Sequence, residues 1–208
     1  MDTELLIQIK KLIIVVVVCQ LAFMLGVLVY KLLRRLREVK LQRGLLERLA
    51  AQFSGHYEPG KKLGYPRATV PLAGYDLNVY YRPRTRYKNA STIVEAGVPG
   101  NKDLEFYIYT KSMLSDVAKV LGMQDVEIGQ HVFDQKFIVK TNKELVIKDF
   151  LNQDLCRHIL GLPMRNISMR YEKGRFVLAV QQMLTDDRDY QQLVETAKLL
   201  IPVLGEKA

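Results

Sequence analysis

The chain has 208 residues, of which 31 are Lys or Arg and 22 are Asp or Glu, so its formal net charge is +9 at pH 7. The excess of bases lies in residues 1–50 and 61–88, whereas residues 89–208 hold 15 bases and 16 acids. A dedicated nucleic-acid-binding protein would carry its bases on the folded domain, so nucleic acid is not an expected partner. Two cysteines, Cys19 and Cys156, are too few for a domain held together by disulfides.

The first predicted element is a transmembrane helix over residues 12–33, preceded by a short tail of residues 1–11. Between Leu12 and Tyr30, Gln20 is the only strongly polar residue. A helix rises about 1.5 Å per residue, so this segment can cross a hydrocarbon core of about 30 Å. It is longer than the apolar region of a typical signal peptide, and no small-residue cleavage site follows it. The sequence therefore predicts a retained single-pass anchor in the cell membrane.

The charges that flank this segment predict its orientation. Lys10 and Lys11 precede it. Seven bases lie at or just beyond its other end: Lys31, Arg34, Arg35, Arg37, Lys40, Arg43 and Arg48. The positive-inside rule places the flank with more bases in the cytoplasm, so we expect an N-terminus outside and a cytoplasmic C-terminal domain. The opposite topology stays open, because Lys10 and Lys11 can also retain the N-terminus inside.

Small residues line one face of the predicted transmembrane helix. Cys19, Ala22 and Gly26 fall at positions i, i+3 and i+7. Two helices can approach closely along such a face, and Gln20 could then form a hydrogen bond across the pair. The face predicts a homodimer through the membrane helix. The alternative is that these small residues make no specific contact.

Residues 34–53 are predicted to continue as a juxtamembrane amphipathic helix. The positions of a heptad seam are Leu32, Leu36, Val39, Arg43, Leu46, Ala50 and Phe53. Three interpretations stay open. The helix forms a short coiled coil that continues a dimeric membrane helix, or lies on anionic headgroups, or packs onto its own domain.

Residues 54–65 are rich in Gly, Pro and Lys and predict a linker to a cytoplasmic domain over residues 66–208. Alternating polar and apolar residues predict strands over 67–72, 77–82, 91–96, 104–110, 125–129, 132–140, 166–171 and 175–181. Apolar stripes predict helices over 112–122, 144–151, 154–160 and from 186 onward. Because the strands come in runs, we expect an α+β fold with a mostly antiparallel sheet and three or four helices.

Three local features of this domain are predicted more closely. In the strand over 132–140, Phe133, Phe137 and Val139 form one buried face, which leaves Asp134 at a strand edge or turn. The spacing of Thr141 and Glu144 predicts a capping box at the next helix. The last helix carries an apolar stripe of Tyr190, Leu193, Val194, Ala197, Leu200, Ile201 and Leu204.

The most informative polar segment is residues 80–88. Its bases Arg82, Arg84, Arg86 and Lys88 interleave with three tyrosines. In a membrane protein the nearest polyanion is the headgroup layer, so these bases are candidate contacts for lipid or for an acidic partner. The alternative without a ligand is an exposed strand end with a solvated loop. Stacking on RNA is the least favoured of the three interpretations.

No catalytic, metal or cofactor motif is found. The histidines are scattered, at His56, His131 and His158, and the glycines form no phosphate-binding loop. Cys156 fits a small core residue better than a nucleophile. The acidic cluster of Asp186, Asp187 and Asp189 is explained by the start of a helix rather than by a bound cation. We therefore expect no catalytic residue, no metal and no cofactor.

One pattern resembles a known group of proteins. It reads Gly129-x-x-x-Phe133-Asp134-x-x-Phe137-x-Val139, followed by a helix and then Leu160-Gly161-Leu162. It is similar to a pattern in uncharacterised prokaryotic single-pass membrane proteins of unknown function. In that group a strand with this pattern precedes paired helices, a hairpin and a terminal helix. The resemblance covers roughly residues 100–204 and implies a fold, but no activity.

The sequence thus favours a single-pass membrane protein with a non-catalytic binding or scaffolding domain, with the bilayer and a membrane protein complex as partners. The alternative is a membrane-bound hydrolase or transferase whose site is dispersed in the sequence. A concave site that unites His131 with Asp134 or Cys156 would favour the enzyme, whereas a flat or basic surface would favour the binding domain.

Overall fold

The computed structural model describes residues 3–61, 64–72, 74–86, 88–100, 103–113 and 123–206, with side chains from residue 11 to residue 205 within these ranges. The chain divides into two compact units, Met1–Leu41 and Gln42–Ala208. Each unit is described by itself.

The first unit is helical. It holds the greater part of α1, a helix of 50 residues over Thr3–Gln52. Among the described residues, α1 is the one helix long and apolar enough to cross a membrane. No residue of its most apolar 18-residue segment is buried by the rest of the protein. The predicted span of residues 12–33 lies in this part of α1. An apolar helix without protein cover is what a lipid environment requires.

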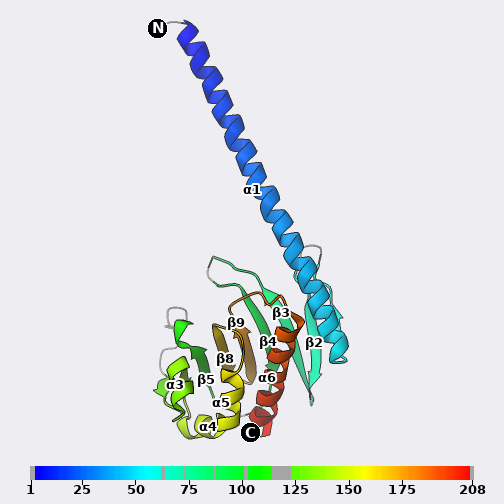
Figure 1. Cartoon of the computed structure of the whole chain (residues 1–208), viewed down its shortest axis with the longest axis vertical. Coiled ribbons are helices and arrows are strands. Elements are labelled where there is room, and N and C mark those ends of the chain that lie inside the picture. The colour runs from blue at the N-terminus through cyan, green and yellow to red at the C-terminus, as the bar shows by residue number, and fades with distance from the viewer. Residues whose placement is uncertain are drawn as a thin grey trace. The chain divides into compact units, whose positions relative to one another are not determined.

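The second unit is an α+β domain built on one antiparallel sheet (Figure 1). The described residues contribute nine strands to it, in the order β1-β2-β3-β4-β9-β8-β5-β7-β6. The first four strands are β1 (His56–Glu58), β2 (Arg67–Leu72), β3 (Tyr75–Arg82) and β4 (Ser91–Gly97). The others are β5 (Phe106–Thr110), β6 (Gln124–Val126), β7 (Phe137–Thr141), β8 (Ile167–Glu172) and β9 (Arg175–Val180). The β8–β9 hairpin joins β1–β4 on one side to β5, β7 and β6 on the other, so the predicted fold class is confirmed.

The helices of this unit are α3 (His131–Lys136), α4 (Glu144–Phe150), α5 (Gln153–Leu160) and α6 (Asp187–Glu206), with a 3-10 turn, η1, at Lys111–Met113. In Figure 1, α5 and α6 lie side by side in front of the central strands; α6 packs on β4 and β9, and α5 contacts both α3 and α6. Every residue of the predicted stripe on α6 is buried, at 0–3% exposure. The last turns of α1, from Gln42 to Gln52, add Leu45, Leu46, Leu49 and Ala50 to the same core.

Most predicted strands are confirmed within two residues of their ends, but residues 132–140 do not form one strand. They divide into α3 and β7. Phe133, Phe137 and Val139 are all buried, yet Phe133 reaches the core from a helix. Asp134 therefore lies on a helix rather than at a strand edge. Its carboxylate accepts hydrogen bonds from the backbone N–H groups of Ile128 (3.0 Å) and Gly129 (2.9 Å), which favours a helical turn here.

The predicted capping box is also wrong. Lys143 is the N-cap of α4, and no side chain forms a capping bond there. The Thr141 hydroxyl donates instead to the carbonyl of Glu105, at 2.9 Å. Strand β1 occurs inside the predicted linker of residues 54–65. Most of the predicted helix over 112–122 lies outside the described residues.

Candidate functional site

The predicted basic segment forms the connection between β3 and β4. We call residues 83–90 the basic loop. Arg84, Thr85, Arg86 and Lys88 are exposed. The Thr85 N–H donates to the Lys88 carbonyl (2.9 Å), and the Lys88 N–H donates to the Thr85 hydroxyl (3.1 Å), so the loop closes on itself as a turn. The turn gathers three bases at one end of the sheet.

Arg82, the fourth predicted contact, is the last residue of β3 and is only partly buried. Its Nε atom is buried and forms no hydrogen bond with any described residue. The outer nitrogens of a guanidinium can still face a ligand when Nε is enclosed, so Arg82 can act with the loop.

A chain of hydrogen bonds ties the start of the folded unit to the strand that follows the basic loop. The side-chain amide of Gln42 (Nε2) donates to the backbone carbonyl of Leu184 at 2.8 Å. The Leu184 N–H donates to the Thr92 hydroxyl at 3.2 Å, and Thr92 is the second residue of β4. The basic loop therefore lies at the end of the sheet where the chain enters the domain.

The β8–β9 turn marks the other end of the sheet. Arg175 pairs with Gly97, the last residue of β4, whereas the basic loop precedes Ser91, the first. Lys173 in this turn is exposed and so offers a base at the end remote from the loop.

The predicted pairing face of α1 is available in the single chain. Cys19, Ala22 and Gly26 are exposed, and a Cβ added at Gly26 would meet no atom within 4 Å. Pairing through this face stays a prediction, since a single chain does not test it.

The heptad seam is not available along its whole length. Leu46 and Ala50 are 0% and 2% exposed in the core of the second unit, whereas Leu32 and Leu36 are 46% and 43% exposed. For its last turns α1 packs onto its own domain, as one of the three interpretations predicted. A coiled coil cannot use Leu46 and Ala50 while they remain in that core.

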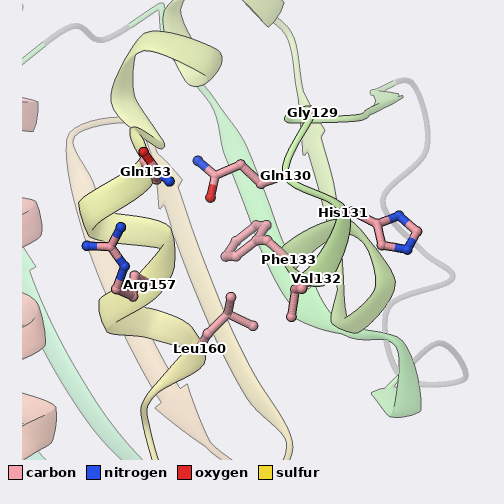
Figure 2. A pocket seen from close by; sticks show the side chains of 8 residues that line it. All are labelled: Gly129, Gln130, His131, Val132, Phe133, Gln153, Arg157 and Leu160. Atoms are coloured by element: carbon pink, nitrogen blue, oxygen red, sulfur yellow. The ribbon is translucent and has the colours of Figure 1, made fainter.

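A groove that the sequence did not predict lies between α3 and α5 (Figure 2). Its volume is about 370 Å³. The lining residues are Gly129, Gln130, His131, Val132, Phe133, Gln153, Arg157 and Leu160. Figure 2 shows Gln130 and Gln153 extending toward each other and the Phe133 ring lying between the helices, whereas His131 points away from α5. The lining combines the buried ring of Phe133 with the polar side chains of Gln130, Gln153 and Arg157.

The groove does not gather the catalytic set that the enzyme hypothesis required. The Asp134 carboxylate is occupied by two backbone N–H groups, and His131 contacts Gln135 at 2.8 Å. Cys156 is fully buried, with its sulfur 3.4 Å from the Leu151 carbonyl. Burial, with Asp134 nearby, raises the pKa of the Cys156 thiol to about 12, so the reactive thiolate is disfavoured.

Among the described residues, no group of three His, Cys, Asp or Glu side chains could hold a metal ion. Two of the three acidic residues at the start of α6 have partners within the protein. Asp186 accepts from the Arg188 N–H at 2.8 Å, and Asp187 forms an ion pair with Arg48 at 3.0 Å.

Comparison with known proteins identifies the fold alone. No protein-family model and no curated protein matches the sequence. The crystal structure of the mycobacterial trehalose monomycolate transport factor A, TtfA, has a similar fold, with a TM-score of 0.56 and 11% sequence identity. The alignment covers 78% of this chain and 95% of TtfA. The likeness to TtfA, at this identity, supports the α+β architecture and assigns no activity.

Proposed function

We propose that this protein is a single-pass membrane protein whose C-terminal domain lies on the cytoplasmic side and binds anionic headgroups with its basic loop. The domain would act as a non-catalytic binding or scaffolding module at the cell membrane. The observation that carries the proposal is the hydrogen-bonded connection from Gln42 through Leu184 to Thr92, which brings the basic loop to the end of the domain where the anchored chain enters.

The length of the tether supports the proposal whatever the orientation of the two units. Nine residue steps separate Leu33, the end of the predicted span, from Gln42. Even a fully extended chain of this length reaches only about 30 Å. The entry end of the domain therefore cannot move farther than that distance from the bilayer. The negative surface potential attracts its bases once they come within a Debye length of the surface, about 8 Å at physiological ionic strength.

The expected binding energy is sufficient to favour the membrane-bound state of the domain. A Lys or Arg near an anionic membrane surface contributes about 1 kcal/mol. Arg84, Arg86 and Lys88 together would contribute about 3 kcal/mol, which favours the bound state by about a hundredfold. The solved protein with a similar fold is described as a transport factor rather than an enzyme, and this agrees with a non-catalytic role.

The test uses the full chain in lipid nanodiscs. Asn89 is exposed in the basic loop, so an Asn89→Cys variant can carry an environment-sensitive fluorophore without removing the Thr85 hydroxyl that closes the loop, with Cys19→Ser as background. We expect the fluorophore to be quenched by lipid-borne quenchers in discs with anionic lipid and not in zwitterionic discs. High salt should reduce the quenching, because it screens exposed charges.

Charge reversal provides the matched comparison. Reversing Arg84, Arg86 and Lys88 to Glu should abolish the quenching, whereas Lys173→Glu, at the remote end of the sheet, should not. Equal quenching in both kinds of disc would refute binding to anionic headgroups, because contact with lipid would then not depend on lipid charge. A loop that stays unquenched in every disc but whose bases are needed to retain a copurifying acidic protein would identify that protein as the ligand instead.

The orientation has its own test. Alkaline phosphatase fused after residue 208 is active only outside the cytoplasm, so an active fusion would refute the cytoplasmic assignment.

We also propose that the span pairs through Cys19, Ala22 and Gly26. The open space at Gly26 means that Gly26→Ile fits a single helix, so any effect reports on association. In a membrane two-hybrid assay Gly26→Ile should reduce self-association, while Leu28→Ile should not. Equal signals for the two variants would exclude this face.

A further inference from the structure

The last turns of α1 present an apolar set that repeats at about one helical turn. Leu45, Leu46, Leu49 and Ala50 are each at most 2% exposed and all lie in the core. If this segment slid by four residues, Leu49 and Ala50 would replace Leu45 and Leu46, so apolar side chains would again meet the core. Hydrophobic burial alone therefore selects this axial position only weakly.

Gln42 breaks that repeat. It is 0% exposed, as are its neighbours Thr92 and Tyr190. The Tyr190 hydroxyl donates a hydrogen bond to the side-chain oxygen (Oε1) of Gln42, and the side-chain nitrogen (Nε2) of Gln42 donates to the Leu184 carbonyl. The Thr92 hydroxyl, which accepts from the Leu184 N–H, donates to the carbonyl of Gln182 at 2.9 Å. Three elements, α1, α6 and β4, thus share one buried polar network.

A slide of one turn in either direction would break this network. In one direction Leu46 would replace Gln42, and both the Tyr190 hydroxyl and the Leu184 carbonyl would lose the hydrogen bond that Gln42 gives them. In the other direction Gln42 would enter the apolar position of Leu46, and Glu38, four residues earlier, would take the place of Gln42. Burying unpaired polar groups is costly, so both slipped states are disfavoured.

We propose that Gln42 is a register key, a buried polar residue that allows only one axial position of residues 42–52 against α6 and β4. A single polar residue in an apolar helix seam is known to specify register at some expense in stability. Since α1 also carries the predicted membrane span, the key would define how the anchored helix enters the domain. The proposal is independent of lipid binding by the basic loop.

Two contacts on the rim of the seam report the register. The Gln191 amide donates to Gln52 at 2.6 Å, and Arg48 pairs with Asp187 at 3.0 Å. After a slide of one turn, position 52 would lie near 187, or position 48 near 191. Cysteine pairs at 52 and 191, at 52 and 187, and at 48 and 191 therefore distinguish the native register from the two slipped ones.

The experiment measures the yield of each pair with a short bifunctional thiol reagent, on the full chain in detergent micelles with a Cys19→Ser background. Two test variants are compared with the parent protein. Gln42→Met keeps the length of the side chain and removes its hydrogen bonds, and Gln42→Leu with Tyr190→Phe replaces both partners by apolar groups. We expect the native pair to lose about half of its yield or more in the test variants, with matching yield in a slipped pair.

Thr196→Val is the control. Thr196 is buried on α6, donates to Gln192 at 2.7 Å and contacts His158 at 3.0 Å. Its loss should lower the melting temperature without producing a slipped pair. A folded test variant that forms only the native pair would refute the register key. Failure of both test variants to fold would also refute it, because the network would then be a requirement for folding rather than a choice of register.

Discussion

The structure makes a sharp prediction about two leucines that the heptad pattern treats as equivalent. Leu36 and Leu46 occupy the same predicted seam of α1, but Leu46 is 0% exposed in the domain core and Leu36 is 43% exposed. A buried Leu→Ala substitution removes apolar contacts and leaves a cavity, and usually costs 2–5 kcal/mol. We therefore expect Leu46→Ala to lower the free energy of unfolding by about 3 kcal/mol. Leu36→Ala should change it by less than about 0.5 kcal/mol.

The assay is thermal unfolding of the full chain in detergent, followed by circular dichroism. For a domain of this size, 1 kcal/mol corresponds to about 2–4 °C, so Leu46→Ala should lower Tm by about 6–12 °C while Leu36→Ala leaves it nearly unchanged. Cross-linking of the two variants in membranes measures self-association in parallel. If both variants lose self-association and neither loses thermal stability, the seam is a coiled coil and the core assignment of the last turns of α1 is wrong.

Further predictions concern the turn before α3 and two buried titratable groups. Gly129 has φ of +84°, so Gly129→Ala should lower the free energy of unfolding, measured by urea titration, by about 1 kcal/mol. The control is Gly97→Ala: Gly97 has open space around it and no positive φ, so this variant should be nearly neutral in the same titration. Asp134→Ala should speed hydrogen exchange at the amides of Ile128 and Gly129, which its carboxylate binds, and lower stability by about 2 kcal/mol; unchanged exchange would contradict these two hydrogen bonds. Burial raises the pKa of Tyr190 above its ordinary value of 10.0. Its contribution to stability is therefore complete below pH 10 and falls as the pH rises further, because the unfolded tyrosine ionises first. Tyr190→Phe should flatten the alkaline decline measured by urea unfolding, and an identical decline in both proteins would contradict this. In a variant that lacks the cysteine of the span, Cys156 should resist alkylation at pH 8 until the protein unfolds, and rapid alkylation of the folded protein would show that its site is open.

The elements that sequence could predict are those whose pattern fits one kind of structure. The stripe on α6 repeats over several turns with a helical period, and every residue of it is buried. The pattern of residues 132–140 fits two kinds of structure. Phe133 and Phe137 are spaced for one face of a strand and also for one face of a helix. The backbone bonds to Asp134 decide in favour of a helix, and they depend on a turn at Gly129 that the alternation conceals.

The candidate sites differ in how far apart their residues lie in the sequence. The basic segment was visible because its chemistry is local, with four bases in residues 82–88. The groove was not, since it requires α3 and α5 to lie side by side across about 20 residues of sequence. Strand β1 is similar: three residues in a segment rich in Gly and Pro become a strand only by pairing with β2.

The order in which the contacts can form connects the anchor with the domain. Gln42, Arg48 and Gln52 belong to the first quarter of the chain, yet their partners are Leu184, Tyr190, Asp187 and Gln191. Strand β4 likewise cannot form its pairing with β9 until β9 has been made. During synthesis the last turns of α1 therefore cannot form this set of contacts until about residue 191 has been made, and contacts so distant in sequence form slowly. An anchored chain that ends before Leu184 should leave Leu45, Leu46 and Leu49 exposed at the membrane surface, where limited proteolysis would cut α1 that the complete protein protects.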